Sequence, residues 1–260
     1  MNEIIQRTDF AKRTAISAGE ILKKHFGGRQ DWRIKSHRET VTDADIESEE
    51  FIIREIEREF GESILSEEFH PNTDISGAQW IIDPLDGTNN FSCGIPFFCV
   101  IIAFAVNGDT KVGVIHEPLR NETFWTDGKS SYVGDVKLNV SNTTKLDETF
   151  VATGFPYNRG HDVESNLENF VRIATICRGI RRAGSAGLDL AYTAAGQFDF
   201  YWELGLKPWD MAAGELLVRC AGGKTGMFDG KSWNIHSDRI LAGNSVIFEK
   251  ASKLLEDENI

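Results

Sequence analysis

Two aspartates stand three residues apart in the segment 80–88, WIIDPLDGT, which begins with an apolar run. The run predicts a buried strand that ends at Asp83, because the proline after it cannot donate the next ladder hydrogen bond. Asp86 and the glycine after it turn the chain toward a helix start. There the amides of Gly87 and Thr88 have no partner within the helix and can bind phosphate oxygens. Carboxylates repel a phosphate unless a cation lies between them, so the segment indicates a metal-assisted phosphate site.

The ligand types of such a site select the metal. Carboxylate oxygens are hard ligands, and without cysteine or histidine beside them they favour Mg²⁺, with Mn²⁺ as the other candidate. Asp-Pro and Asp-Gly are also ordinary turn formers, so this segment alone does not decide between a site and a simple turn. Two further acidic segments favour a site: Ser66-Glu67-Glu68 ends another predicted strand, and Pro208-Trp209-Asp210 begins a predicted helix.

Other chemistries have weaker support in the sequence. Gly223-Lys224-Thr225 is similar to the end of a P-loop, but Val218 stands where that motif requires a glycine. No GxSxG elbow surrounds Ser185, and there is no GxGxxG motif. The six histidines are scattered without a catalytic or zinc spacing. The four cysteines form no CxxC pair and are expected to be reduced thiols, at Cys93, Cys99, Cys177 and Cys220.

Charge and hydropathy exclude several classes of partner. The 260 residues include 28 Lys+Arg and 40 Asp+Glu, a formal charge of −12. Nucleic acids and anionic membranes repel such a chain, so neither is expected as a partner. The start MNEIIQRTDF carries charges where a secretory signal needs an apolar run, and the longest apolar run, Ile95–Val106, is too short to cross a bilayer. We therefore expect a cytoplasmic protein with one domain spanning 1–260.

The elements that position the acidic segments are predicted in separate blocks. Apolar residues at helical spacing predict helices near 4–26, 42–60, 162–177, 186–196, 209–221 and from 245 onward. Short β-like runs bounded by turn residues predict strands near 64–65, 80–82, 97–106, 111–116, 122–125, 149–153 and 198–202. This order favours an α+β protein with layered sheets and helices over a single βαβ winding.

Taken together, the acidic segments resemble the signature blocks of the inositol monophosphatase family, within the superfamily of Mg²⁺-dependent, Li⁺-sensitive phosphatases. The blocks are Glu67-Glu68, the segment 83–88 and the segment 209–214, WDMAAG. The resemblance covers nearly the whole chain, through the segments 41–45, 154–157, 184–186 and 199–203. It implies a layered αβαβα sandwich with mixed and antiparallel sheets between helix layers.

The resemblance also implies a cluster of two or three Mg²⁺ ions. Glu67, Asp83 and the backbone carbonyl of Leu85 would hold the first ion. Asp83, Asp86 and Asp210 would hold the second, and Glu67 with water a looser third. Two cations bridged by shared carboxylates can activate a water molecule and stabilise the leaving alkoxide in one in-line displacement, without a covalent intermediate.

The remaining roles implied by the resemblance concern water and substrate. Asp45 and Thr88 would orient the attacking water, with either Asp45 or Glu67 as its base. The amides of Gly87 and Thr88 would bind the phosphate. The alcohol part of a small phosphate ester would contact Asp86, the backbone of Ser185 and Ala186, Glu203 and Asp210.

Three functions remain open at this point. The first is hydrolysis of myo-inositol monophosphate, and the second is hydrolysis of histidinol phosphate, fructose 1,6-bisphosphate or 3′-phosphoadenosine 5′-phosphate by the same metal blocks. The third is a binding or regulatory protein that has lost turnover.

The resemblance further implies a homodimer. Aromatic residues of the sheet region could supply its interface, although core packing explains them equally well: Phe97, Phe98, Phe104 and Trp125.

Overall fold

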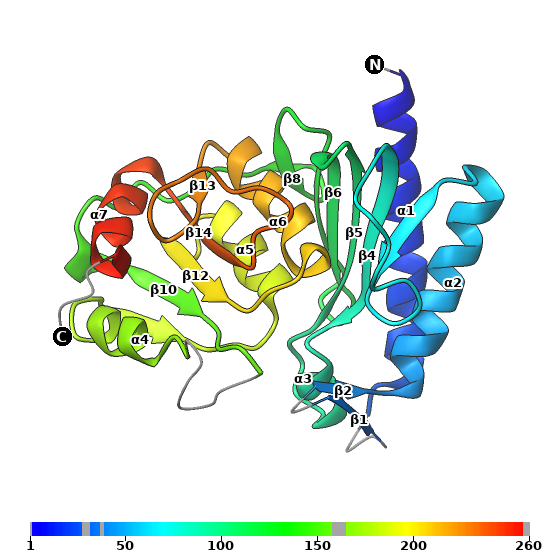
Figure 1. The fold of residues 1–260 in the computed structure, drawn as a ribbon, viewed down its shortest axis with the longest axis horizontal. Helices are drawn as coiled ribbons and strands as arrows, with labels where there is room; N and C mark the ends of the chain where they lie inside the picture. Colours follow the sequence, from blue (N-terminus) through cyan, green and yellow to red (C-terminus); the bar gives the residue numbers. More distant parts are fainter. Residues whose placement is uncertain (1, 28–31, 37–38, 158–164, 257–260) are drawn as a thin grey trace.

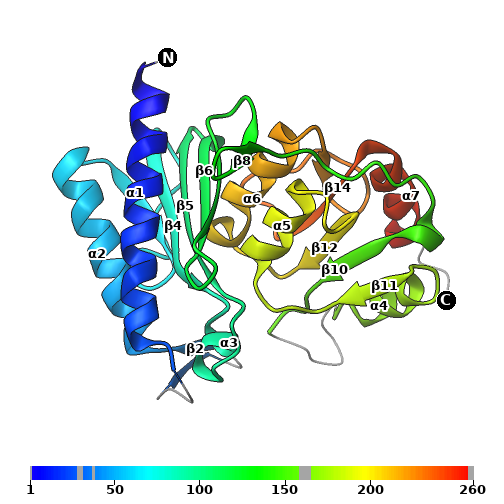
Figure 2. The same cartoon turned by 180° about the vertical axis from the view of Figure 1, so that it is seen from behind.

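A computed structural model describes residues 2–27, 32–36, 39–157 and 165–256 of the chain. Its main helices are α1 (Asn2–His25), α2 (Asp43–Glu59), α4 (Leu167–Ala174), α5 (Ala186–Ala194), α6 (Pro208–Cys220) and α7 (Ser245–Glu256). Figures 1 and 2 show five layers: α1 and α2, a first sheet, α5 and α6, a second sheet, and then α4 and α7. The predicted αβαβα layering is therefore confirmed.

The first sheet has seven strands, β3 (Ser63–Ser66), β4 (Ala78–Asp86), β5 (Cys99–Val106), β6 (Asp109–Glu117), β7 (Glu122–Thr126), β8 (Ser131–Val133) and β9 (Val136–Lys137). They pair in chain order. β3 and β4 are parallel, and each later pair is antiparallel. Short turns are sufficient for antiparallel neighbours, whereas parallel strands need a longer connection.

The second sheet has five strands, β10 (Phe150–Thr153), β11 (Gly179–Arg181), β12 (Phe200–Leu204), β13 (Lys224–Gly226) and β14 (Arg239–Gly243). Their spatial order is β11-β10-β12-β14-β13. β10 is parallel to both of its neighbours, and β14 is antiparallel to both of its own. The prediction of mixed and antiparallel sheets is thus confirmed. A separate hairpin joins β1 (Arg33–Ser36) to β2 (Glu39–Val41).

The start of α2 follows the helix-capping chemistry of the sequence. Thr42 is the extended N-cap residue, and its backbone amide and hydroxyl donate to Asp45 Oδ2 at 2.8 and 2.5 Å. A side-chain acceptor at the third helical position is typical of a capping box. Asp45 is fully buried by this arrangement.

Small residues hold α6 close to both the first sheet and α5. A Cβ on Gly113 of β6 would lie 2.8 Å from the carbonyl oxygen of Ala213, and a Cβ on Gly214 would lie 2.5 Å from side-chain atoms of Leu190. Larger residues would force these layers apart. Close packing therefore fixes the N-terminus of α6, with Asp210, relative to the strands.

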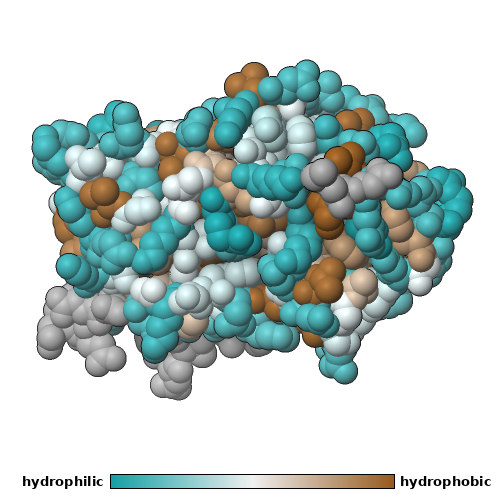
Figure 3. Space-filling view, turned by 90° about the horizontal axis from the view of Figure 1, so that it is seen from above, coloured by the Kyte–Doolittle hydropathy of each residue, from teal (hydrophilic) through white to brown (hydrophobic). Residues whose placement is uncertain are grey.

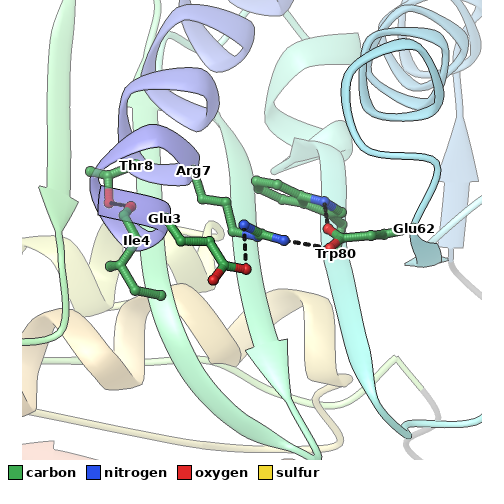
Figure 4. A network of polar contacts seen from close by, with 6 residues as sticks. All are labelled: Glu3, Ile4, Arg7, Thr8, Glu62 and Trp80. Carbon is green, nitrogen blue, oxygen red and sulfur yellow. Dashed lines mark hydrogen bonds and ion pairs between the residues drawn. The ribbon is translucent and has the colours of Figure 1, made fainter. Parts of the chain in front are cut away.

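A polar network attaches the start of α1 to the first sheet (Figure 4). Arg7 pairs with Glu62 and, at 2.9 Å, with Glu3, while Trp80 Nε1 donates to Glu62 at 2.9 Å. The guanidinium also lies over the ring of Phe104, 4.4 Å from its centroid. Because Arg7 is buried, its charge needs these partners to offset the loss of hydration.

Some predicted boundaries differ from the structure. β4 does not end at Asp83 but continues to Asp86, and the strand predicted over 198–202 lies at Phe200–Leu204. The helix predicted over 162–177 is shorter at Leu167–Ala174, and residues 162–164 lie outside the described ranges. The β1–β2 hairpin and the strands β8, β9, β11, β13 and β14 had no predicted counterpart. The hairpin and the shorter helix have few buried residues, so hydrophobic periodicity carries little signal there.

The aromatic residues considered for a dimer interface are mostly used within the chain. Phe98 and Phe104 are buried in the core between α1, α2 and the first sheet. Trp125 stacks on Tyr132 with ring centroids 4.6 Å apart and is covered by Lys12, whose Nζ lies 4.0 Å from the ring. Core packing therefore explains Phe98 and Phe104, and Phe97 and Trp125 are half-buried. The homodimer itself stays a prediction.

No helix within the described ranges is long and apolar enough to cross a bilayer. The face seen in Figure 3 is mostly hydrophilic, with apolar residues in small separate groups. Scattered apolar residues of this kind are ordinary on folded proteins.

Candidate active site

The predicted acidic segments meet in one cleft of about 600 Å³. The predicted site residues that line it come from the end of β3, the end of β4, the start of the short helix α3 (Thr88–Ser92) and the start of α6. They are Glu67, Asp83, Leu85, Asp86, Gly87, Thr88 and Asp210. Clefts of this size commonly hold small-molecule ligands.

A β-bulge brings the two aspartates of β4 to the cleft. Asp83 pairs with Ile101 of β5 and Asp86 pairs with Cys99, so β4 advances three residues where β5 advances two. In a regular strand, residues three apart point to opposite faces, and one extra residue reverses this. The bulge therefore allows Asp83 and Asp86 to face the same cleft. Pro84 lies within it, where a missing amide hydrogen is tolerated.

Gly87 makes the turn from β4 into α3. Its φ is +96°, in the left-handed region that glycine adopts without strain. A Cβ there would also lie 3.0 Å from the carbonyl oxygen of Phe97. The turn places the amides of Gly87 and Thr88 at the beginning of α3, beside the aspartates, as the sequence predicted.

Asp86 is held by the N-terminus of α5. Its Oδ2 accepts hydrogen bonds from Ser185 Oγ at 2.6 Å and from the amide of Gly187 at 2.7 Å, and its Oδ1 accepts from the amide of Ala186 at 3.3 Å. Ser185 and Ala186 are buried and do not line the cleft. In this structure their donors therefore bind Asp86, and they lie behind it.

Asp45 is linked to the cleft by a hydrogen bond with Thr88, which lines it. Thr88 Oγ1 lies 3.0 Å from Asp45 Oδ1 and 3.0 Å from the carbonyl oxygen of Leu85. Asp45 itself does not line the cleft. Burial raises the pKa of Asp45 to about 7, against the effect of the donors on Thr42, and the negative charge of Glu67 adds to the increase.

Burial raises the pKa of the three cleft aspartates, and neighbouring carboxylates add to the increase for Asp83 and Asp210. Burial is the largest cause for each. The charges of Glu67, Asp86 and Asp210 then raise the pKa of Asp83 well above its usual range. The pKa of Asp86 rises only to about 6, because its hydrogen-bond donors favour the ionised form. Such a cluster is short of positive charge.

The donor set fits a hard divalent cation. Four carboxylates and the carbonyl of Leu85 line the same cleft, and these oxygen ligands are those that Mg²⁺ binds. Among the residues that the structure describes, no three or more acidic, histidine or cysteine side chains are already gathered at metal-binding spacing. The carboxylates thus share a cleft without forming a closed cage, as expected for groups that repel one another.

Glu203 lies beside the cleft rather than in its lining. Its Oε2 accepts a hydrogen bond from Tyr201 at 2.6 Å. Its carboxyl group lies directly against Gly154, and a Cβ added at Gly154 would lie only 2.0 Å from atoms of this carboxyl group. The charge of Glu203 contributes to the raised pKa of Asp210 and of Tyr157, two residues that do line the cleft. This carboxylate therefore lies close to the acidic cluster.

Glu49 is a supporting residue that the sequence analysis missed. It is fully buried, and it accepts hydrogen bonds from Ser66 Oγ at 2.6 Å, the amide of Phe69 at 2.7 Å and the amide of Glu68 at 2.9 Å. These bonds fix the turn that carries Glu67. The available signal was its position four residues after Asp45, on the face of α2 that is buried.

Known proteins resemble this chain over nearly its whole length. Residues 4–259 match the model of the inositol monophosphatase family. The chain is 39% identical over 254 residues to a protein of Salmonella typhimurium named Nus factor SuhB, covering 95% of both chains. It is 39% identical over 239 residues to an inositol-1-monophosphatase of Mesorhizobium japonicum, covering 90% of both.

Solved structures give the same result. An inositol monophosphatase from Anabaena superposes with a TM-score of 0.88 at 36% identity, covering 97% of this chain and 96% of that one. The Thermotoga maritima enzyme superposes with a TM-score of 0.87 at 32% identity, covering 96% of each. By sequence and by fold, this chain belongs to the inositol monophosphatase family, whose members are phosphatases.

Proposed function

We propose that this protein is a Mg²⁺-dependent phosphomonoesterase that hydrolyses myo-inositol monophosphate to inositol and phosphate. The observation that carries the proposal is the meeting of Glu67, Asp83, Asp86 and Asp210 in one cleft beside the amides of Gly87 and Thr88. Carboxylates from separate elements can bind a metal ion, and backbone amides at the start of a helix can bind a phosphate group. Both are needed for metal-assisted phosphate transfer to water.

The four carboxylates and the carbonyl of Leu85 would hold the metal. When bound, Mg²⁺ neutralises the phosphate charge and lowers the pKa of a coordinated water. The donors on Ser185 and Gly187 keep Asp86 oriented and favour its ionised, ligating form. The hydrogen bonds that Glu49 accepts fix the turn that carries Glu67.

Thr88 and Asp45 would position the attacking water. Thr88 Oγ1 donates to Asp45, which leaves a lone pair of the hydroxyl free to accept a hydrogen bond from water. The water oxygen then bonds to phosphorus as the ester P–O bond breaks, and the alcohol leaves with a proton taken from solvent. The proton of the attacking water passes to Asp45 through Thr88, or to Glu67 directly.

Glu203 is proposed to set the preference for a polyol. A carboxylate can accept charge-assisted hydrogen bonds from ring hydroxyls. We expect Glu203→Gln to raise KM for inositol 1-phosphate by roughly tenfold, the effect of one such bond, and to leave p-nitrophenyl phosphate almost unchanged. Steady-state kinetics on both substrates checks this. Equal losses on both would instead mean that Glu203 supports the metal site.

Inhibition by Li⁺ and by Ca²⁺ is a further expected result. Li⁺ has half the charge of Mg²⁺, and Ca²⁺ prefers longer bonds and more ligands, so either ion can enter the cluster without activating water properly. Phosphate release at fixed Mg²⁺ should fall as either salt is added, whereas NaCl at the same ionic strength should have little effect. Full turnover with Ca²⁺ as the sole divalent ion would contradict the proposed metal site.

A panel of phosphate esters tests the substrate assignment. Inositol 1-phosphate, histidinol phosphate, fructose 1,6-bisphosphate and 3′-phosphoadenosine 5′-phosphate are compared by kcat/KM, because this ratio measures discrimination between substrates. The highest value for inositol 1-phosphate is expected. A higher value for histidinol phosphate would indicate that the acidic residues around Glu203 bind the ammonium group of that substrate rather than the hydroxyls of a polyol.

A regulatory role is the second candidate. Relatives with 39% identity over 95–96% of the chain bear the name Nus factor SuhB, so membership of the family does not by itself establish turnover as the main role. Every residue expected to bind metal or position water is nevertheless present. A folded protein that binds Mg²⁺ but releases no phosphate from any ester of the panel would favour this second candidate.

A further inference from the structure

Glu203 is held by a neighbour on its own strand that the proposed hydrolysis does not use. Tyr201 and Glu203 are two residues apart on β12, so their side chains lie on the same face of the strand. The hydroxyl of Tyr201 donates to Glu203 Oε2 at 2.6 Å. Tyr201 is fully buried in the core that α5 and α6 share with both sheets, whereas Glu203 is half-buried. A buried ring thus presents its hydroxyl to the carboxylate.

The strands on either side of β12 leave room for the ring of Tyr201. It lies opposite Ala152 of β10 and Ala242 of β14, two small residues that are themselves buried. Close packing of this kind fixes a ring in one orientation. Burial, and after it the charge of Glu203, raises the pKa of Tyr201 well above its usual range. The hydroxyl therefore keeps its proton and remains a donor to Glu203.

Gly154 leaves the space that the carboxyl group of Glu203 occupies. Thr153 at the end of β10 pairs with Trp202, so Gly154 follows beside Glu203. A Cβ added at Gly154 would lie 2.0 Å from Cδ and from Oε2 of Glu203. Any other residue at this position would therefore displace the carboxyl group. Gly205, two residues after Glu203, already lines the cleft, so the carboxylate is fixed directly beside it.

A second carboxyl group lies near this pair. Asp189 of α5 is only 1% exposed, and the charge of Glu203 is, after burial, the largest cause of its raised pKa. Burial favours the neutral form of an acid. The negative charge at this point of the fold therefore belongs to Glu203, the more exposed of the two carboxyl groups.

We propose that Tyr201 and Gly154 are positioning residues that act through Glu203 and thereby set the preference for a polyol phosphate over an aryl phosphate. The inference rests on the proposed hydrolysis and on the role proposed for Glu203. A carboxylate can accept about four hydrogen bonds, so the bond from Tyr201 is compatible with bonds from ring hydroxyls. A carboxylate that is already oriented binds those hydroxyls at a smaller entropic cost.

The test measures KM and kcat for inositol 1-phosphate and for p-nitrophenyl phosphate, with Glu203→Gln as the reference variant. Tyr201→Phe removes only the hydroxyl, and Gly154→Ala places a methyl group where the Glu203 carboxyl group lies. The double variant Tyr201→Phe/Glu203→Gln shows whether the tyrosine acts through the glutamate. Tyr192→Phe is the matched control, because this tyrosine is also buried, accepts a hydrogen bond from Arg120 at 2.6 Å and does not line the cleft.

We expect Tyr201→Phe to raise KM for inositol 1-phosphate about fivefold, the effect of one hydrogen bond, with kcat little changed. Gly154→Ala should raise this KM about tenfold, as Glu203→Gln does, because the carboxyl group must move away. The double variant should have the KM of Glu203→Gln alone. The kinetics on p-nitrophenyl phosphate should stay at the wild-type values in every variant, and Tyr192→Phe should change neither substrate.

A wild-type KM in Tyr201→Phe, equal losses on both substrates, or additive losses in the double variant would overturn the positioning role and leave the hydrolysis intact. A lower melting temperature of Tyr201→Phe without a change in KM would likewise overturn it, since the tyrosine would then be only structural. Hydrolysis of neither substrate by the wild-type protein would overturn the proposed function. Calorimetry of inositol 1-phosphate in Ca²⁺ then decides the inference: weaker binding to Tyr201→Phe than to the wild type supports it, and equal binding or none overturns it.

Discussion

Asp83→Asn and Asp210→Asn are each expected to lower kcat for phosphate release by at least about 10²-fold at saturating Mg²⁺. Each change removes one negative charge from the set that would hold the cation, and it leaves the size of the side chain almost unchanged. Asp83 is buried and Asp210 is half-buried in the cleft, and the charge of Asp210 contributes to the raised pKa of Asp83, so the two groups already interact electrostatically. Steady-state kinetics across a Mg²⁺ titration measures the loss.

A thermal melt separates this effect from unfolding. In EDTA, the two variants should melt at the wild-type temperature or above it, because removal of one of several like charges relieves repulsion. Asp135→Asn is the control, since Asp135 is exposed in the turn between β8 and β9 and should affect neither kinetics nor melting. Turnover near the wild-type value in Asp83→Asn would remove that residue from the metal site.

Thr88→Ala and Asp45→Asn are expected to give the second large effect, a loss of about 10² in kcat for each, within the range for a positioned acid–base group. The two residues act through one hydrogen bond of 3.0 Å. The double variant should therefore be little slower than either single variant, because groups that act as a unit are not additive. Measurement of kcat for the three variants tests the pairing.

Thr88→Ser is the matched control, because it keeps the hydroxyl and removes only a methyl group. It should retain most of the turnover. Fully additive losses in the double variant would show that Asp45 and Thr88 act separately. In that case Glu67 would become the better candidate for the base, since it lines the cleft directly.

The sequence was sufficient for the proposed metal ligands that line the cleft, because those residues stand at the ends of elements with a clear period. The start of α2 at Asp43 and the start of α6 at Pro208 follow capping and apolar spacing. The bulge between Asp83 and Asp86 could not be predicted, because it depends on the register against β5, a partner that the segment does not encode. Without that register, the two aspartates would be expected on opposite faces.

Residues that support the site were harder to predict than those that line it. Glu49 lies on a helix rich in charged residues, where a buried glutamate has the same local pattern as an exposed one. Ser185 was expected at the substrate, and the structure shows it as the N-cap of α5 with its hydroxyl on Asp86. Both roles depend on contacts across distant parts of the chain, and local sequence patterns do not report such contacts.

The most direct measurement is phosphate release from inositol 1-phosphate by the wild-type protein and by Asp83→Asn, each with Mg²⁺ and with EDTA. The wild-type protein should release phosphate in Mg²⁺, lose that activity in EDTA and recover it when Mg²⁺ is restored, as a metal-dependent hydrolase does. Asp83→Asn should show little release under any of these conditions. Equal release by the wild-type protein in Mg²⁺ and in EDTA, or no release above Asp83→Asn from folded protein in Mg²⁺, would contradict metal-dependent hydrolysis at this cleft.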